Sequence, residues 1–213
     1  MKISYDRWNE WLEQIKADAK HLVLSRHMYL DIHHLIRSNQ ALHRTDYFHT
    51  YLHNTYIAHV ATTLRRNLRS KKQSVSLLGL LESIQSEASL VTAKALEEFY
   101  DGGGRESFAR SDFEQELGRS GGRLLPEDVQ KDIDRLRSHA TQCADFFDQR
   151  IAHYDKKLSA PPPTFNHTHE AIDAVVEITA KYVFLLSGLR WTVPRPTVGK
   201  EWLTIFDTAW RAP

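Results

Sequence analysis

A short polar stretch late in the chain carries the residue types that could do chemistry on a phosphate. Asp148, Gln149, Arg150, His153 and Asp155 fall within two turns of a predicted helix, beside two phenylalanines. Positions three and four apart share one face of a helix, so Arg150 and His153 would lie on one strip. A guanidinium can grip a phosphate, and an imidazole can move a proton near neutral pH. The alternative is a solvated polar helix end whose apolar side chains turn to the core.

Histidines elsewhere offer a different chemistry. The chain has 12 histidines, and His49 and His53 are four residues apart on a predicted helix, with His59 further on. A zinc site needs at least three protein ligands, whereas the sequence names no convincing third ligand and contains no His-Glu-x-x-His motif. We therefore predict no metal site, and a metal-binding helical protein that uses His49 and His53 stays as a third functional alternative. His167 and His169 stand at a predicted helix start, where capping is the simpler explanation.

Covalent catalysis and cofactor binding find no support. Cys143 is the only cysteine and falls in an apolar stripe, so we predict a small core hydrophobe rather than a nucleophile. The chain lacks a Gly-x-Ser-x-Gly motif. Three consecutive glycines at 102–104 are followed by no Gly-Lys-Ser/Thr sequence and preceded by no strand, which excludes a phosphate-binding loop. The sequence implies no cofactor.

The composition is that of an ordinary globular chain. Its 213 residues are enough for one sizeable core, 41% of them are hydrophobic, and the formal net charge is +1. These values give no global sign of nucleic-acid or membrane binding. No apolar run approaches the roughly 20 residues of a membrane helix, and the N-terminus has no apolar signal core. We therefore expect a cytoplasmic protein without membrane association.

Apolar residues recur at helical spacing through the first half of the chain, and no strand-like alternation occurs. Ser4 is predicted to cap a first helix that ends at residues 38–40. A second helix is predicted from residues 45–46 to about Leu68, with an apolar stripe that begins at Phe48. The basic residues at its end suit a helix C-terminus and predict a solvated surface. These residues are Arg65, Arg66, Arg69, Lys71 and Lys72.

The middle of the chain is predicted to hold shorter helices and a connection. Ser76 can cap a leucine-rich helix, and helical spacing returns over residues 88–100. Six glycines among residues 101–125 predict a mobile connection, with a short helix over residues 107–117.

Two long helices are predicted in the second half. Pro126 marks the start of the longest helix, which should reach about residue 158, near 50 Å away, before prolines 161–163 end it. Asn166 or Thr168 is predicted to cap the next helix, whose apolar residues on several sides make it the central packed helix. An aromatic segment at residues 201–210 should form a short helix that docks on the body. The prediction is a single all-α domain over residues 1–213.

Four segments of the sequence, taken in order, resemble sequence motifs of a known family. They are residues 36–40, 74–81, 150–155 and 202–210. In this order they are similar to the HEPN superfamily, in particular its abortive-infection-U-like branch. The resemblance implies a helical bundle with long helices, often a homodimer, from prokaryotic anti-phage or toxin–antitoxin systems that include a neutralising partner. Active members are metal-independent ribonucleases with an arginine followed, four to six residues later, by a histidine.

The resemblance assigns roles to individual residues. His153 matches the histidine and would take the 2′-hydroxyl proton, but no arginine stands four to six residues before it. The nearest cation is Arg150, which would act on the phosphate in its place, unless a partner chain supplies the cation. The remaining residues of the stretch would contact RNA: Asp148, Gln149, Tyr154, Asp155 and Lys156.

Two hypotheses about function follow from the resemblance. The first is a HEPN-like protein of prokaryotic defence or toxin–antitoxin type that acts on RNA as a metal-independent endoribonuclease or as an RNA-binding relative. The second is a catalytically silent dimeric protein with a scaffolding role, in which the ribonuclease site has decayed.

Overall fold

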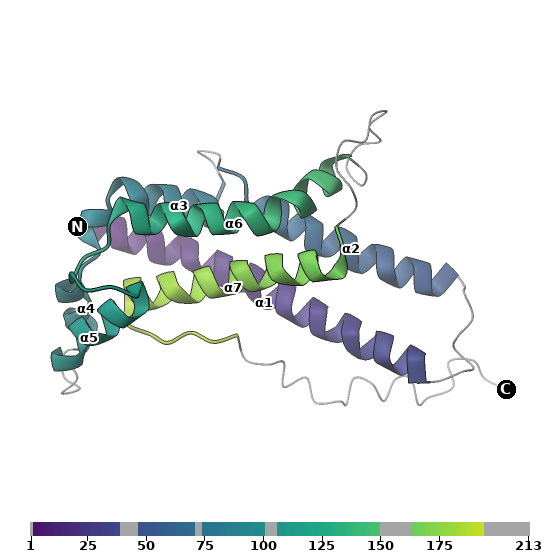
Figure 1. Ribbon diagram of the computed structural model, residues 1–213, viewed down its shortest axis with the longest axis horizontal. Helices are drawn as coiled ribbons and strands as arrows, with labels where there is room; N and C mark the ends of the chain where they lie inside the picture. Colours follow the sequence, from purple (N-terminus) through teal and green to yellow (C-terminus); the bar gives the residue numbers. More distant parts are fainter. Residues whose placement is uncertain (1, 39–46, 71–73, 101–105, 150–162, 194–213) are drawn as a thin grey trace.

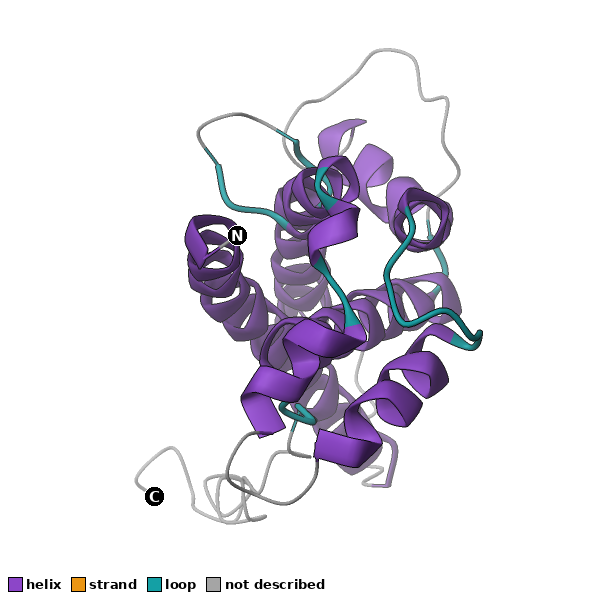
Figure 2. Cartoon of the chain, turned by 90° about the vertical axis from the view of Figure 1, so that its left-hand side faces the viewer, coloured by secondary structure: helices purple, strands orange, loops and turns teal. Residues whose placement is uncertain are grey.

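The described part of the chain is a bundle of α-helices (Figure 1). The computed structural model describes residues 2–38, 47–70, 74–100, 106–149 and 163–193. The helices are α1 (Lys2–Ser38), α2 (Tyr47–Asn67), α3 (Leu77–Ser86), α4 (Ala93–Tyr100), α5 (Glu106–Leu117), α6 (Pro126–Phe147) and α7 (Phe165–Ser187). No strand is present in these ranges (Figure 2), where one antiparallel bridge joins Thr92 to Arg123. The predicted all-α fold class is thus confirmed for the described residues.

The long helices pack lengthwise around α7. This helix contacts both α1 and α6, while α2 and α3 pack against α6. The short helices α4 and α5 pair with each other near the start of α1 (Figure 1). Figure 1 also shows α1 and α2 running past the points where α6 ends and α7 begins.

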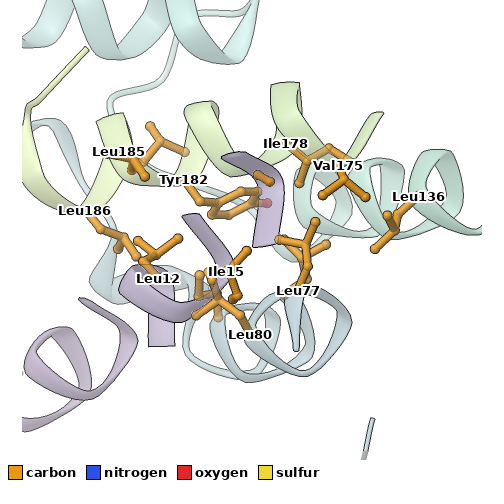
Figure 3. Close-up of a cluster of buried hydrophobic side chains, with 14 of the residues drawn as sticks. Leu12, Ile15, Leu77, Leu80, Leu136, Val175, Ile178, Tyr182, Leu185 and Leu186 are labelled. Carbon is orange, nitrogen blue, oxygen red and sulfur yellow. The ribbon is translucent and has the colours of Figure 1, made fainter. Parts of the chain in front are cut away.

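A continuous apolar core fills the bundle. Leu12 and Ile15 of α1 meet Leu77 and Leu80 of α3, with Tyr182 of α7 among them (Figure 3). All five side chains are nearly or fully buried. Because removing apolar surface from water is the main favourable contribution to folding, this cluster positions the helices that carry the candidate site.

The predicted central helix is α7, and its burial is confirmed. Its apolar residues are buried on several faces, and it ends at Gly188, whose φ of +69° is a left-handed conformation that favours glycine. The predicted caps Asn166 and Thr168 are wrong, because Thr164 is the N-cap. The Thr164 hydroxyl accepts a hydrogen bond from the backbone N–H of His167 at 3.3 Å. The His167 ring nitrogen Nδ1 accepts one from the N–H of Thr164 at 3.4 Å, so the predicted capping role of His167 is confirmed.

The start of α6 is as predicted. Pro126 occupies the first turn, and the Asp128 carboxylate accepts a hydrogen bond from the N–H of Leu125 at 3.1 Å. The predicted end near residue 158 lies outside the described residues. Among the described helices, α1 with 37 residues is longer than α6 with 22, so α6 as described is not the longest helix.

Three other sequence predictions are corrected. Ser4 is not a cap, because α1 begins at Lys2, and the Ser4 hydroxyl instead donates to Glu87 at 2.7 Å. Phe48 is 48% exposed and so does not extend the buried stripe of α2. The predicted helix over residues 88–100 is interrupted, because Val91 turns extended after a 3₁₀ turn and α4 begins only at Ala93.

Other predicted elements are confirmed. The Ser76 hydroxyl accepts a hydrogen bond from the N–H of Gly79 at 3.0 Å and caps α3. The short helix predicted within the glycine-rich stretch is α5, whose Phe113 is completely buried. The aromatic segment at residues 201–210 lies outside the described residues.

A buried polar contact joins α6 to α7. Asp132 accepts hydrogen bonds from the Tyr182 hydroxyl at 2.9 Å and from the Lys181 ammonium at 2.7 Å. Burial and the adjacent Asp132 carboxylate raise the pKa of Tyr182 well above its usual value. The Tyr182 phenol therefore stays protonated at neutral pH and acts as the donor in its hydrogen bond to Asp132.

Candidate functional site

The structure places the first two residues of the predicted phosphate-binding stretch at the end of α6. The backbone N–H of Asp148 donates to the carbonyl oxygens of Ala144 and Asp145, and Gln149 follows in the same turn. The other predicted site residues lie outside the described residues: Arg150, His153, Tyr154, Asp155 and Lys156.

An arginine from another helix meets this end of α6. Arg65 of α2 forms an ion pair with Asp148, and its guanidinium lies 5.6 Å from the centre of the Phe147 ring. The paired atoms, Arg65 Nε and Asp148 Oδ1, are both shielded from solvent. The Asp148 side chain as a whole is 42% exposed and that of Arg65 24%, so the pair is partly open to solvent. We call Arg65, Phe147 and Asp148 the arginine–aspartate cluster.

Sequence reasoning missed Arg65 as a site residue. The basic cluster that contains it suits the C-terminus of a helix, which predicts a solvated helix end rather than a specific contact. Its neighbour Arg66 also has a specific partner, since its Nε donates to Asp18 of α1 at 2.8 Å. No local signal could have paired Arg65 with Asp148, which follows it by more than 80 positions and reaches it only through the packing of α2 on α6.

A small apolar depression adjoins this cluster. It is lined by Ile57, Val60, Ala61, Cys143, Phe146, Pro163 and Thr168. Burial raises the pKa of the Cys143 thiol above its ordinary value, opposed by a contact with the Thr168 hydroxyl. A thiol in this environment stays protonated near neutral pH, and the prediction that Cys143 is a core hydrophobe is confirmed by its 2% exposure.

A second group of side chains gathers where α1, α2 and α7 meet. The Tyr29 ring stacks on Tyr56 with ring centres 4.2 Å apart and on Phe165 at 5.6 Å. The Tyr29 hydroxyl lies 3.2 Å from Nδ1 of His53, within hydrogen-bond distance. Burial raises the pKa of Tyr56 to about 12. We call these residues the aromatic–histidine cluster, with Phe165 at its exposed edge.

An arginine also borders the aromatic–histidine cluster. Arg26 of α1 donates to Asp173 of α7 at 2.7 Å and to the backbone oxygen of His169 at 3.3 Å. Burial lowers the pKa of His169, and the nearby Arg26 charge acts in the same direction. The Nε2 atom of His169 is buried and makes no hydrogen bond with the described residues. A neutral imidazole is therefore the favoured form of His169 at neutral pH.

The pair His49 and His53 is not joined by a third ligand in the described part of the chain. There, no group of three or more His, Cys, Asp or Glu side chains is placed to hold a metal ion. His53 contacts Tyr29, and the His49 ring lies 6.0 Å from Phe48. The two histidines thus have separate aromatic surroundings.

Comparisons with protein-family models, with curated proteins and with solved structures found no match for this chain. The HEPN resemblance drawn from the four sequence segments accordingly stays a prediction. Among the described residues, no helix combines the length and the apolar character needed to cross a membrane.

Proposed function

We propose that this chain is an RNA-directed protein of HEPN type whose site lies at and beyond the end of α6. The observation that supports the proposal is the ion pair between Arg65 and Asp148. It brings a guanidinium from α2 to the point from which the sequence continues to Arg150 and His153. The family pattern asks for an arginine near the histidine, and Arg65 can supply that cation from a different helix.

The proposed chemistry is RNA cleavage by the 2′-hydroxyl of the substrate. His153 accepts the proton of that hydroxyl, and the 2′-oxygen attacks the adjacent phosphorus. The bond from phosphorus to the 5′-oxygen breaks, and that oxygen takes up a proton. The products are a 2′,3′-cyclic phosphate and a 5′-hydroxyl end. Arg65 and Arg150 stabilise the charge that develops on the phosphate oxygens, with no metal required.

Asp148 would have a defined part in this scheme. Its carboxylate neutralises the Arg65 guanidinium in the free protein. A substrate phosphate would replace Asp148 as the partner of Arg65, because a phosphate oxygen is an anionic acceptor like the carboxylate that it displaces. Gln149 and the residues that follow would contact the neighbouring nucleotides.

The second candidate is the catalytically silent dimeric scaffold. The same ion pair favours it in one respect, since Asp148 already satisfies Arg65 and leaves no uncompensated charge at the end of α6. In this case the arginine–aspartate cluster would serve only to hold α2 against α6. Both candidate functions include a homodimer with the His153 face near its interface and a cognate neutralising partner.

Cleavage of a structured RNA pool in EDTA tests the proposal. The wild type should release fragments with cyclic-phosphate ends, and His153→Ala should release none. Arg65→Ala should slow cleavage by about 100- to 1,000-fold, as expected when one transition-state contact is lost. Arg65→Lys should recover only part of the rate, because an ammonium cannot form the paired hydrogen bonds of a guanidinium.

Arg135→Ala is the matched control for Arg65→Ala. Arg135 also forms an ion pair between two helices, with Glu177, but this pair is exposed and lies away from the end of α6. Its loss should leave cleavage unchanged. Absence of cleavage by the wild type, with or without metal, would favour the scaffold. Equal cleavage by the wild type and His153→Ala would show that His153 is not the acid–base group.

A further inference from the structure

The rings of the aromatic–histidine cluster form a stack whose outer end is open to solvent. Tyr56 is 5% exposed, Tyr29 is 8% exposed and Phe165 is 41% exposed. The Tyr29 ring contacts both of the others, with its plane 9° from that of Tyr56 and 22° from that of Phe165. The stack therefore runs from the interior to the surface. Tyr29 covers one side of the Phe165 ring, and the rest of that ring remains half exposed.

An unused histidine nitrogen stands beside the exposed ring. The His53 and Phe165 rings meet edge to face, with centres 5.5 Å apart and planes at 70°. Nδ1 of His53 lies 3.2 Å from the Tyr29 hydroxyl, whereas Nε2 makes no hydrogen bond with the described residues. An imidazole nitrogen donates or accepts according to the tautomer. The outer end of the stack thus combines a planar apolar surface with one available polar atom.

Two buried polar atoms in the same region also lack partners. They are the hydroxyl of Tyr56 and Nε2 of His169, neither of which makes a hydrogen bond with the described residues. His169 follows Phe165 by one turn of α7, and their ring centres are 6.4 Å apart. Because nearly all buried polar groups in proteins are hydrogen-bonded, unpaired ones are expected where a bound molecule completes a site.

The charges next to the cluster do not favour a phosphate. Arg26 donates to Asp173 at 2.7 Å, and residues 47–64 of α2 contain no Asp, Glu, Lys or Arg. Binding to a phosphate backbone depends on Lys and Arg, whereas a neutral planar group needs neither. A nucleobase is such a group, because its face stacks on aromatic side chains and its edge carries donors and acceptors.

We propose that the aromatic–histidine cluster binds an unpaired nucleobase, which stacks on Phe165 and forms a hydrogen bond with Nε2 of His53. Nε2 of His169 becomes a second contact when the Phe165 ring changes rotamer, which exposed side chains do rapidly. Stacking on an aromatic ring accepts any base, because every base has a π face. This inference goes beyond the proposed function and does not rest on it, since stacking requires no cleavage.

Fluorescence anisotropy with a labelled single-stranded oligodeoxyadenylate tests the proposal. This probe has no 2′-hydroxyl, so the proposed ribonuclease chemistry cannot cleave it, and the two proposals fail or succeed separately. Phe165→Ala should weaken binding by about 5- to 100-fold, the loss expected for one stacked base. Phe165→Tyr keeps an aromatic face and should bind within about twofold of the wild type. His53→Ala should weaken binding by about 2- to 10-fold, as one hydrogen bond is lost.

Phe108→Ala is the matched control for Phe165→Ala. Phe108 is another exposed phenylalanine, with 60% exposure, but it lies on α5, away from the start of α7 (Figure 1). Its loss should leave binding unchanged. Circular dichroism should show the same helical signal for every variant, because the substituted side chains are not fully buried. If Phe165→Ala loses helix, the Phe165→Tyr variant and the strands compared with the wild type still decide.

An abasic strand of the same length separates base recognition from phosphate recognition. The wild type should bind it at least about fivefold more weakly than the oligodeoxyadenylate, and Phe165→Ala should not weaken that binding further. Equal binding of the two strands by the wild type would overturn the proposal, as would binding of neither strand or unchanged binding by Phe165→Ala. Adenosine monophosphate as a competitor identifies the source of the base. Displacement of the strand would support a free nucleotide as the ligand, and no displacement would support a base within a strand.

Discussion

The two ends of the bundle differ in how far their polar and aromatic side chains are buried and hydrogen-bonded. At the closed end, where α1 begins beside α3, Trp8 is fully buried and its ring N–H donates to Ser83 at 2.9 Å. The Tyr5 hydroxyl there donates to the backbone oxygen of Leu90 at 3.3 Å. At the open end, where α1 stops and α2 begins, Tyr47 and Tyr51 face solvent. The closed end thus satisfies the polar atoms of Trp8 and Tyr5 internally, although Phe99 and Phe108 are exposed there as well.

Buried polar atoms show the same contrast. The Tyr56 hydroxyl and Nε2 of His169 are buried without a hydrogen bond to the described residues, and both lie toward the open end. Groups of this kind cost free energy unless something satisfies them, so they are expected where a protein binds something. We therefore expect the buried contacts of Trp8 and Tyr5 to contribute more to stability than the exposed side chains at the start of α2.

The largest expected effect is at Trp8. Trp8→Ala removes a fully buried ring and its hydrogen bond to the Ser83 hydroxyl, so the free energy of unfolding should fall by about 3–5 kcal/mol. Tyr51→Ala at the open end should change it by less than about 0.5 kcal/mol. Urea unfolding followed by circular dichroism measures both. Similar losses from the two substitutions would contradict the division between the ends.

The next largest effect is expected at the contact between α6 and α7. Asp132→Ala leaves the buried Tyr182 hydroxyl and the Lys181 ammonium without their acceptor, at a cost of about 2–4 kcal/mol in unfolding free energy. Asp132→Asn should cost less, because the amide oxygen can still accept from Tyr182. If urea unfolding gives equal losses for Ala and Asn, the hydrogen bond to Tyr182 is not the source of the effect.

A smaller, pH-dependent effect is expected at Asp128. The Arg119 guanidinium, which donates to its carboxylate at 3.0 Å, holds the pKa of Asp128 below its usual value. A lowered folded pKa means that this stabilisation is present at neutral pH and is lost as the pH falls below the ordinary aspartate value toward the lower folded pKa. Asp128→Asn should lower stability at pH 7 by about 1–2 kcal/mol.

The comparison of acid and neutral conditions checks the assignment at Asp128. Unfolding free energies of the wild type and Asp128→Asn should approach each other as the pH falls through the acid range. A difference that stays constant with pH would show that the charge on Asp128 is not involved.

Most of the fold could be predicted from the sequence because its signals are local. Pro126 begins α6, Ser76 caps α3 and Gly188 ends α7, each through the conformation of a few neighbouring residues. The sequence did not predict the interruption between the 3₁₀ turn and α4, because the residues around Val91 continue the apolar spacing of a helix. Their extended backbone is explained by pairing with residues 122–124, where the N–H of Leu124 donates to the carbonyl oxygen of Val91.

The candidate site could be predicted only in part, because its partners are distant in the chain. The polarity of the stretch from Asp148 onward is visible in the sequence, whereas its contact with Arg65 depends on how α2 packs on α6. The exposure of Phe48 was also not predicted, since an aromatic residue at helical spacing normally indicates a core position. Contacts between helices and the limits of the bundle are tertiary properties that periodicity does not report.

Amide hydrogen exchange with and without single-stranded RNA tests most directly whether the arginine–aspartate cluster borders the functional site. The His153→Ala protein should be used, so that bound RNA is not cleaved. We expect slower exchange at residues 60–67 and 143–149, which surround the arginine–aspartate cluster, and unchanged exchange in α3, α4 and α5. Slower exchange confined to α3, α4 and α5, or no change at any segment under saturating RNA, would contradict the account.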